Sequence, residues 1–114
     1  MGKGEVDVVE TEIFENAELE HVLTLSKDYN FEGKIYKEVD LSGLEDIKAI
    51  DMIEASKLYE RSGGFSIAPE LQMEYAMIIA SKAAKKPVEF FYGLPPRDAI
   101  AVKNRVTRFF YGRD

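Results

Sequence analysis

Residues 69–85 form a segment that is apolar around almost the whole circumference of a helix. At about 100° per residue, its polar side chains fall in one narrow strip, which consists of Glu70, Glu74, Ser81 and Lys85. Pro69 suits the first turn of this helix, where its missing N–H is not needed. A helix this apolar is buried on more than one side. We therefore expect it to be the centre of the fold or part of an interface between copies of the chain.

A shorter amphipathic helix is predicted before it, over about 46–62. Its clearest part is 52–61, where the charged residues lie off one apolar face. That face consists of Met52, Ala55, Leu58 and Tyr59. Ile53 departs from the pattern, and Gly63-Gly64 ends the helix. The single apolar face predicts packing along one side only.

The last predicted helix, over 96–111, is the cleanest amphipathic element of the chain. It opens at Pro95-Pro96 and ends at Gly112. Its apolar arc consists of Ala99, Val102, Val106, Phe109 and Phe110. Three arginines lie on the other side of the wheel, namely Arg97, Arg105 and Arg108. We therefore expect the arc to face the core and the arginines to face solvent.

Two β-rich runs, over 22–26 and 34–41, predict a hairpin. Between them, Asn30-Phe31-Glu32-Gly33 supplies turn chemistry, and Gly33 is free to take a positive φ. A lone hairpin is marginally stable in water, so we expect residues 22–41 to pack on a helix. The predicted fold is α+β and mostly helical: an N-terminal β-hairpin followed by three main α-helices and one short helical turn.

The short helical turn, predicted over 88–92 after Pro87, contains the first copy of a repeated aromatic tetrad. Phe90-Phe91-Tyr92-Gly93 returns as Phe109-Phe110-Tyr111-Gly112, and the two tetrads hold six of the thirteen aromatic residues. The simpler interpretation is that both are helix C-termini with a glycine cap and aromatic core anchors. The alternative is that one tetrad also lines a partner-binding groove.

Charge divides the chain into an acidic and a basic half. Residues 1–60 hold 16 acids and 6 bases, a net −10, whereas residues 61–114 hold 5 acids and 9 bases, a net +4. Residues 1–20 carry seven acids and one lysine without a sustained period, so we expect an acidic, flexible arm. The rest, 21–114, is expected to be a single domain. Neither a signal peptide nor a membrane-spanning apolar run is recognised, which predicts a cytoplasmic protein without a membrane partner.

The residue pattern favours neither metal binding nor catalysis. Glu18-Leu19-Glu20-His21 matches half of a Glu-x-x-His carboxylate-metal motif, but His21 is the only histidine, so a second copy is missing. A zinc site is not favoured either, because the chain contains no cysteine. Ser–His–Asp chemistry would also have to use His21, at the border of the arm and a strand, where no neighbours are predicted to hold it. We expect no enzyme activity, no metal and no cofactor.

A nucleic-acid-associated protein is the more serious alternative. The last helix combines Arg97, Arg105 and Arg108 with nearby aromatic residues, and nucleic-acid binders join basic grooves to aromatic platforms. On the wheel, however, the aromatic residues fall on the apolar arc and the arginines largely opposite. That separation favours core packing with a solvated basic face, and the acidic remainder of the chain opposes phosphate. Nucleic acid is therefore not the expected partner.

An ordered set of pieces runs through about residues 21–112. It begins with His21-Val-Leu-Thr-Leu and continues through Gly33-Lys-Ile-Tyr-Lys-Glu-Val-Asp-Leu-Ser-Gly-Leu44, Asp51-Met-Ile-Glu-Ala-Ser-Lys-Leu-Tyr59 and the alanine-rich middle helix. It closes with Leu94-Pro-Pro-Arg-Asp-Ala-Ile through Val106-Thr-Arg-Phe-Phe110. This set resembles the tail assembly chaperones of long-tailed bacteriophages and prophages. The leucine-proline–aspartate start and the paired phenylalanines of the last helix look most typical.

Members of that family are not enzymes, and the resemblance implies a binding function. The protein would bind the tape measure protein, a long, largely helical and apolar chain that sets tail length. It would keep this client soluble until tail tube subunits polymerise around it, and then leave. The tail tube protein is a further implied partner. The implied location is the cytoplasm of the bacterial host, with absence from the mature virion, whereas a structural tail subunit would persist there.

The resemblance carries over no binding residues, so candidates come from the residues themselves. A helical client offers apolar anchors at i, i+3, i+4 and i+7, which a groove between amphipathic helices accepts and methionine side chains adapt to. The candidates for client binding are Met52, Tyr59, Met73, Met77, Phe90, Phe91, Tyr92 and Phe110. The nearly all-round apolar helix also predicts self-association.

Overall fold

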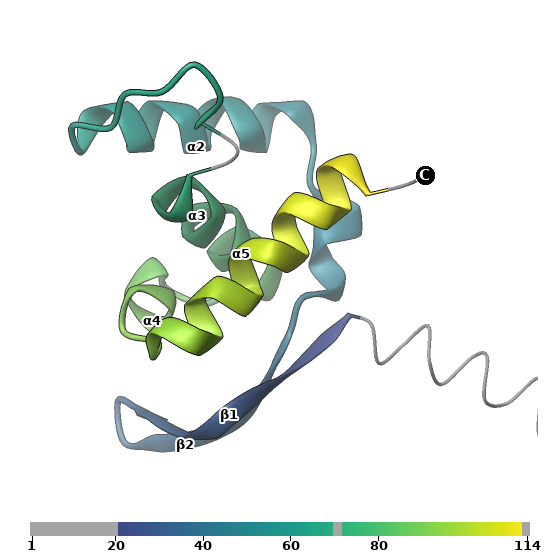
Figure 1. The fold of residues 1–114 in the computed structure, drawn as a ribbon, viewed down its shortest axis with the longest axis vertical. Coiled ribbons are helices and arrows are strands. Elements are labelled where there is room, and N and C mark those ends of the chain that lie inside the picture. Colours follow the sequence, from purple (N-terminus) through teal and green to yellow (C-terminus); the bar gives the residue numbers. More distant parts are fainter. Residues whose placement is uncertain (1–20, 70–71, 113–114) are drawn as a thin grey trace, which may run out of the picture.

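A computed structural model of the chain describes residues 21–69 and 72–112 (Figure 1). The predicted acidic arm over 1–20 lies outside the described residues. In chain order the elements are β1 (Val22–Phe31), β2 (Lys34–Asp40), the 3-10 turn η1 (Ser42–Asp46), α2 (Ala49–Arg61), α3 (Met73–Ala84), α4 (Val88–Tyr92) and α5 (Pro96–Tyr111). The predicted fold class is confirmed: an antiparallel hairpin precedes three longer helices and a short one.

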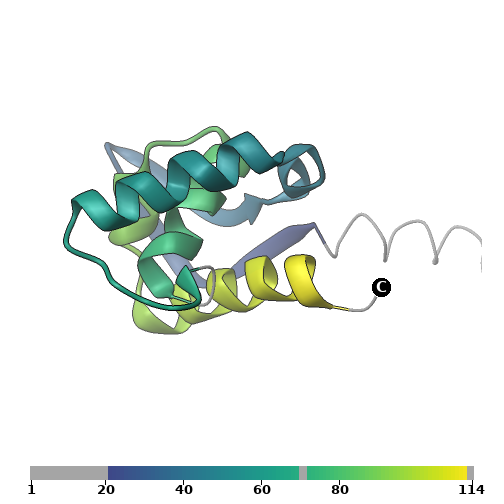
Figure 2. The ribbon, with the colours of Figure 1, turned by 90° about the horizontal axis from the view of Figure 1, so that it is seen from above.

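α3 lies at the centre of the fold and contacts α2, α4, α5 and η1 (Figure 2). Its buried side chains are Tyr75, Ala76, Met77, Ile78, Ile79, Ala80 and Ala83. Burial within the fold therefore accounts for the apolar circumference. The helix begins at Met73 and not at Pro69, because Gln72 is extended, with φ −90° and ψ 148°. It ends at Ala84, and Lys85 takes a left-handed conformation with φ 58°.

β1 carries an irregularity at the place where it contacts α5. Thr24 pairs with Glu38 and Tyr29 pairs with Tyr36, so residues 25–28 of β1 oppose only Lys37. A bulge of this kind leaves backbone groups without a ladder partner. The N–H of Ser26 donates to Oδ1 of Asp98 at 2.9 Å, and its hydroxyl to Oδ2 at 3.0 Å. Asp98 is buried in the first turn of α5 and fixes the hairpin to that helix.

The ring of Phe90 on α4 holds the other end of the hairpin. It makes edge-to-face contacts with Tyr29, Phe31 and Tyr36, at centroid distances of 5.1, 5.2 and 5.0 Å. The Tyr29 hydroxyl also donates to the Phe90 carbonyl oxygen at 2.7 Å. The hairpin thus packs on helices, as its marginal stability in isolation required. Gly33 in its turn has φ 84°, the positive value that the sequence predicted.

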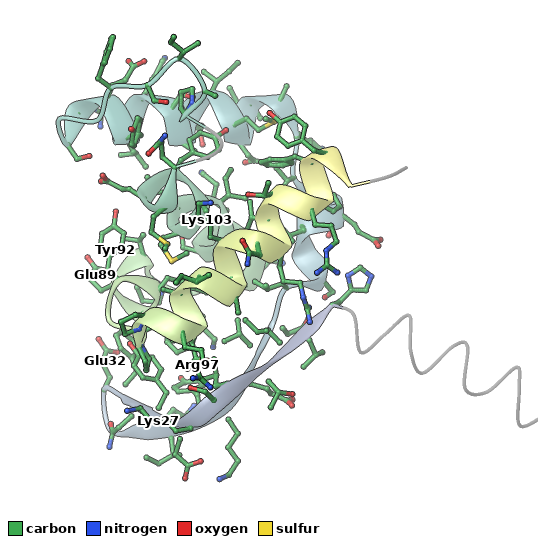
Figure 3. All side chains as sticks on the ribbon, viewed as in Figure 1. Lys27, Glu32, Glu89, Tyr92, Arg97 and Lys103 are labelled. Atoms are coloured by element: carbon green, nitrogen blue, oxygen red, sulfur yellow. The ribbon has the colours of Figure 1, made fainter. Side chains whose placement is uncertain are left out.

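α5 has the predicted bounds but not the whole predicted core face. Val102 and Val106 are fully buried, whereas Phe109 is 43% exposed, so its assignment to the core was wrong. Phe109 lies about three turns beyond Asp98, on the same side of the helix, at 3.6 residues per turn. β1 covers Asp98 but begins only at Val22, and Phe109 lies beside His21. Figure 3 shows Arg97 at the opposite end of α5, next to the hairpin.

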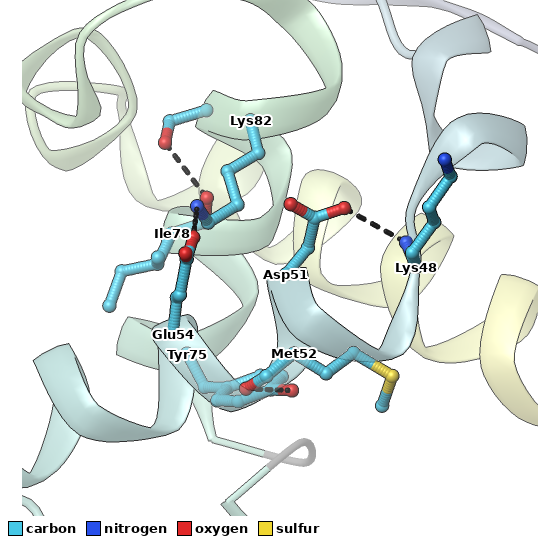
Figure 4. Close-up of polar contacts among 8 residues, drawn as sticks. Lys48, Asp51, Met52, Glu54, Tyr75, Ile78 and Lys82 are labelled. Atoms are coloured by element: carbon cyan, nitrogen blue, oxygen red, sulfur yellow. Dashed lines mark hydrogen bonds and ion pairs between the residues drawn. The ribbon is translucent and has the colours of Figure 1, made fainter.

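α2 packs on α3 through polar contacts as well as apolar ones (Figure 4). The Lys82 ammonium pairs with Glu54 at 3.0 Å, and the Tyr75 hydroxyl donates to the Met52 carbonyl oxygen at 3.4 Å. α2 begins at Ala49, later than the predicted residue 46, because residues 42–46 form η1. The Asp51 carboxylate accepts the Lys48 N–H at 2.9 Å, which satisfies one of the free N–H groups at this helix start.

η1 lies so close to α3 that one position accepts only glycine. A Cβ built on Gly43 would overlap the backbone carbonyl group of Ala83. The turn and the end of α3 can therefore approach backbone to backbone. Leu44, the next residue, is buried in the core.

Candidate functional site

Half of the predicted client-binding candidates are core residues. Tyr59, Met77, Phe90 and Phe91 are all buried. Phe90 and Tyr59 stabilise the fold and reach neither of the hollows described next. Met77 and Phe91 contribute to a hollow only from beneath.

The larger hollow lies where α3, α4 and α5 meet. Its volume is about 390 Å³, and its lining consists of Met73, Glu74, Met77, Phe91, Tyr92 and Ala99. Met73 and Tyr92 are partly exposed at its edge. Four of the sequence candidates therefore meet in one place, and the apolar lining suits an aliphatic or aromatic side chain.

A second hollow of about 300 Å³ adjoins the first, because both are lined by Glu74 and Tyr92. The remaining lining residues come from α2, α3, α4 and the residue after α2, and they are Leu58, Ser62, Ile78, Ser81, Lys82 and Val88. Leu58 was predicted to face the core, but it is partly exposed and lines this hollow. We call the two hollows together the Glu74 groove.

A carboxylate crosses the middle of this groove. Oε2 of Glu74 accepts the Ser62 hydroxyl at 2.5 Å and the Tyr92 hydroxyl at 3.4 Å. Partial burial, and next the charge of Glu74, raise the pKa of Tyr92 above its usual value, so this phenol is protonated at neutral pH. Glu89 lies beside Tyr92 on α4 (Figure 3), and its charge acts in the same direction. The wall between the two hollows is thus negative, and the lining on each side of it is mostly apolar, with Lys82 as the one cation in the second hollow.

The loop from α2 to α3 exposes further apolar side chains. It leaves α2 beside Ser62, which lines the second hollow, and returns at Met73, which lines the first. Phe65 and Ile67 on this loop are 92% and 100% exposed, the highest values for large apolar residues in the described part of the chain. The predicted sites omitted both. Their signal was local, since two large apolar residues stand in a Gly-, Ser- and Pro-containing stretch without helical period.

The other two candidates lie away from the groove. Met52 on α2 and Phe110 on α5 are half-buried and pack against the core. Neither lines either hollow. They support the scaffold that carries the groove.

The predicted basic surface is divided between the two ends of α5. Arg105 and Arg108 line a smaller hollow of about 130 Å³ together with His21, Leu41, Leu44 and Phe109. We call it the Arg108 hollow. Arg97 does not belong to it. The predicted separation of arginines from aromatic residues was wrong for Phe109, which lies among them because β1 does not extend far enough to cover it.

Within 21–69 and 72–112, His21 and the acidic residues do not come together as a metal-binding cluster. No group of three or more metal-ligating side chains occurs there. His21 lies 3.0 Å from Glu45, in a pair that joins the start of β1 to η1. Glu18, the glutamate of the Glu-x-x-His match, lies outside the described residues. Within the same ranges, no helix has both the length and the apolar character needed to cross a membrane.

The chain was compared with protein-family models, with curated proteins and with solved structures, and none of the three comparisons found a match.

Proposed function

We propose that the protein is a phage tail assembly chaperone that binds the tape measure protein and keeps it soluble during tail morphogenesis. The observation that carries the proposal is the Glu74 groove, with Phe65 and Ile67 exposed on the loop whose ends reach it. Apolar surface of this kind marks interaction sites in proteins. The ordered resemblance along residues 21–112 supplies the client.

The size of the groove suits transient binding. Each hollow has room for a side chain or two of a helical client, whose anchors recur at i, i+3, i+4 and i+7. A single such contact is weak, so many copies along a long client would supply retention through multivalency. Weak individual contacts would also allow release when tail tube subunits polymerise. The proposed place of action is the cytoplasm of the bacterial host.

Co-expression with the tape measure protein of the same phage or prophage genome tests the proposal. The protein should raise the soluble fraction of this client and elute with it. Phe65→Ser combined with Ile67→Ser should lower that fraction without lowering the free energy of unfolding, because both side chains are exposed. Ile35→Ser is the matched control, since Ile35 is exposed on the hairpin and lines neither hollow.

Two outcomes would overturn the proposal. The first is a client that stays insoluble with the wild-type chaperone and forms no complex with it. The second is detection of the protein in purified mature virions at a fixed stoichiometry, which would indicate a structural tail subunit instead.

One observation favours a second function, association with nucleic acid. The Arg108 hollow brings two arginines to an exposed phenylalanine, and basic grooves with aromatic platforms bind single strands. The chain's net charge of −6 weighs against this alternative.

A further inference from the structure

We propose that the Glu74 groove selects amphipathic helices that carry a lysine or arginine between two apolar anchors. This inference deepens the proposed function and rests on it for the identity of the client. It concerns the sequence feature that such a client segment must have.

The shape of the groove places one residue of a bound helix over the Glu74 carboxylate. The two hollows share the wall formed by Glu74 and Tyr92, so an apolar side chain in each would straddle that wall. On one face of a helix, apolar anchors follow each other after three, four or seven residues. A residue between two anchors of the same face would then lie over the carboxylate.

The wall that the two hollows share carries a negative charge. The Glu74 carboxylate is held by two neutral hydroxyls, those of Ser62 and Tyr92. No cation forms an ion pair with Glu74 in the described ranges, and Lys82, the one lysine in the lining of the two hollows, is paired with Glu54 at 3.0 Å. Glu89 adds a second negative charge beside Tyr92.

A bound helix would cover this carboxylate and take it partly out of water. Burying a charge is costly unless an opposite charge accompanies it. A wholly apolar or acidic segment would therefore lose affinity at the wall, whereas a lysine or arginine would recover it. The chain's own residues 1–20 are disfavoured as the occupant for the same reason, because they carry seven acids and one lysine. A basic amphipathic helix is the complementary partner.

Three synthetic peptides test the inference by fluorescence anisotropy with the full chain. Each has a helix-forming alanine- and glutamine-rich background with two leucines at i and i+7, and arginine, glutamine or glutamate between them on the same face. The arginine peptide should bind the wild type roughly fivefold more tightly than the glutamine peptide, the ratio that about 1 kcal/mol gives. The preference should fall as salt screens the pair.

Variants assign that preference to one carboxylate. Glu74→Gln keeps the size of the side chain and should abolish the preference, and Glu74→Lys should favour the glutamate peptide. Glu60→Gln, on an exposed part of α2 outside both hollows, should leave the preference unchanged. Equal affinities of the wild type for the three peptides, or no binding of any of them, would overturn the inference.

The two proposals fail separately. If the tape measure protein is solubilised but the peptides show no preference, the charge rule is wrong and the chaperone function stands. If the peptides follow the rule but the tape measure protein stays insoluble, the groove binds basic helices and the client is another one.

Discussion

The carboxylate of Asp98 accepts both the backbone N–H and the hydroxyl of Ser26, which joins the first turn of α5 to the bulge of β1. Asp98 is 2% exposed, the only charged residue buried in the described part of the chain. The helix N-terminus favours a negative charge at this place. The bulge leaves the Ser26 N–H without a partner in β2, and the buried Asp98 carboxylate accepts its hydrogen bond.

Asp98→Ala should therefore destabilise the protein strongly. The change removes a charged acceptor and leaves the Ser26 N–H without its partner, which we expect to lower the free energy of unfolding by about 3 kcal/mol. Ser26→Ala removes only the hydroxyl bond and should lower it by about 1 kcal/mol. Urea unfolding of both single variants and of the double variant measures the coupling. An effect of Asp98→Ala no larger than that of Asp46→Ala, at an exposed acid in η1, would contradict the assignment.

The two aromatic tetrads should respond differently to the same substitution. Phe90→Ala should lower the free energy of unfolding by about 4 kcal/mol, because it empties a buried site that three hairpin rings surround. Phe109→Ala should lower it by less than about 1 kcal/mol, since the ring is partly exposed at the Arg108 hollow. Equal losses in urea unfolding would show that the second tetrad is also a core anchor.

The buried face of α5 allows a sharper test of its orientation. Val106→Asp should lower the free energy of unfolding by more than about 3 kcal/mol, because it buries a charge without a partner. Arg108→Ala, two residues along, should lower it by less than about 0.5 kcal/mol, because Arg108 is exposed. Thermal unfolding followed by circular dichroism distinguishes the two. Similar melting temperatures would mean that α5 is rotated from its described position.

Alkaline pH should weaken the contact between the hairpin and α4. Burial raises the pKa of the Tyr29 phenol, which must stay protonated to donate to the Phe90 carbonyl oxygen. Its stabilisation is fully present below the unfolded-state pKa of about 10 and decreases as the pH rises through the folded-state pKa. Tyr29→Phe should lose about 1 kcal/mol at neutral pH and show a smaller alkaline decrease than the wild type. Parallel decreases in the two proteins, measured by urea unfolding across this pH range, would contradict the role of Tyr29.

The Arg108 hollow offers a direct test of the nucleic-acid alternative. If that function holds, labelled DNA or RNA should shift with the protein at low salt, and the shift should weaken as salt rises. Arg105→Glu combined with Arg108→Glu should abolish it. Absence of a shift at low salt would dismiss this alternative and leave the chaperone proposal unaffected.

The positions of the helices could be predicted from local sequence patterns, and the central position of α3 from its high apolar content. The narrow polar strip of residues 69–85 was enough to predict burial on several sides, because few arrangements hide an apolar circumference. The proline and glycine signals around α5 gave its bounds as the structure has them. The start of α3 was misplaced because Gln72 interrupts a helix that Pro69 could have begun.

The roles of the two tetrads could not be read from their sequences, which are the same. Phe90 is buried because the hairpin, distant in sequence, lies against it, whereas Phe109 lies beyond the start of β1. The Glu74 groove also could not be predicted, because residues distant in sequence form it. Glu74 meets Ser62 and Tyr92, which are 12 and 18 residues away, only after the helices have packed. Its place in a polar strip indicated solvent, not a wall between two hollows.

The close approach of Gly43 to the Ala83 carbonyl group restricts the residue type that related sequences can have at position 43. Surface residues and even groove residues can be substituted while the fold is kept. A side chain at position 43 would instead force η1 away from α3. We expect every natural sequence with this fold to keep glycine at position 43, because the atoms of Ala83 that it meets belong to the backbone and are present in any residue. Gly43 and the buried Asp98 together would identify distant relatives whose overall sequence similarity is low.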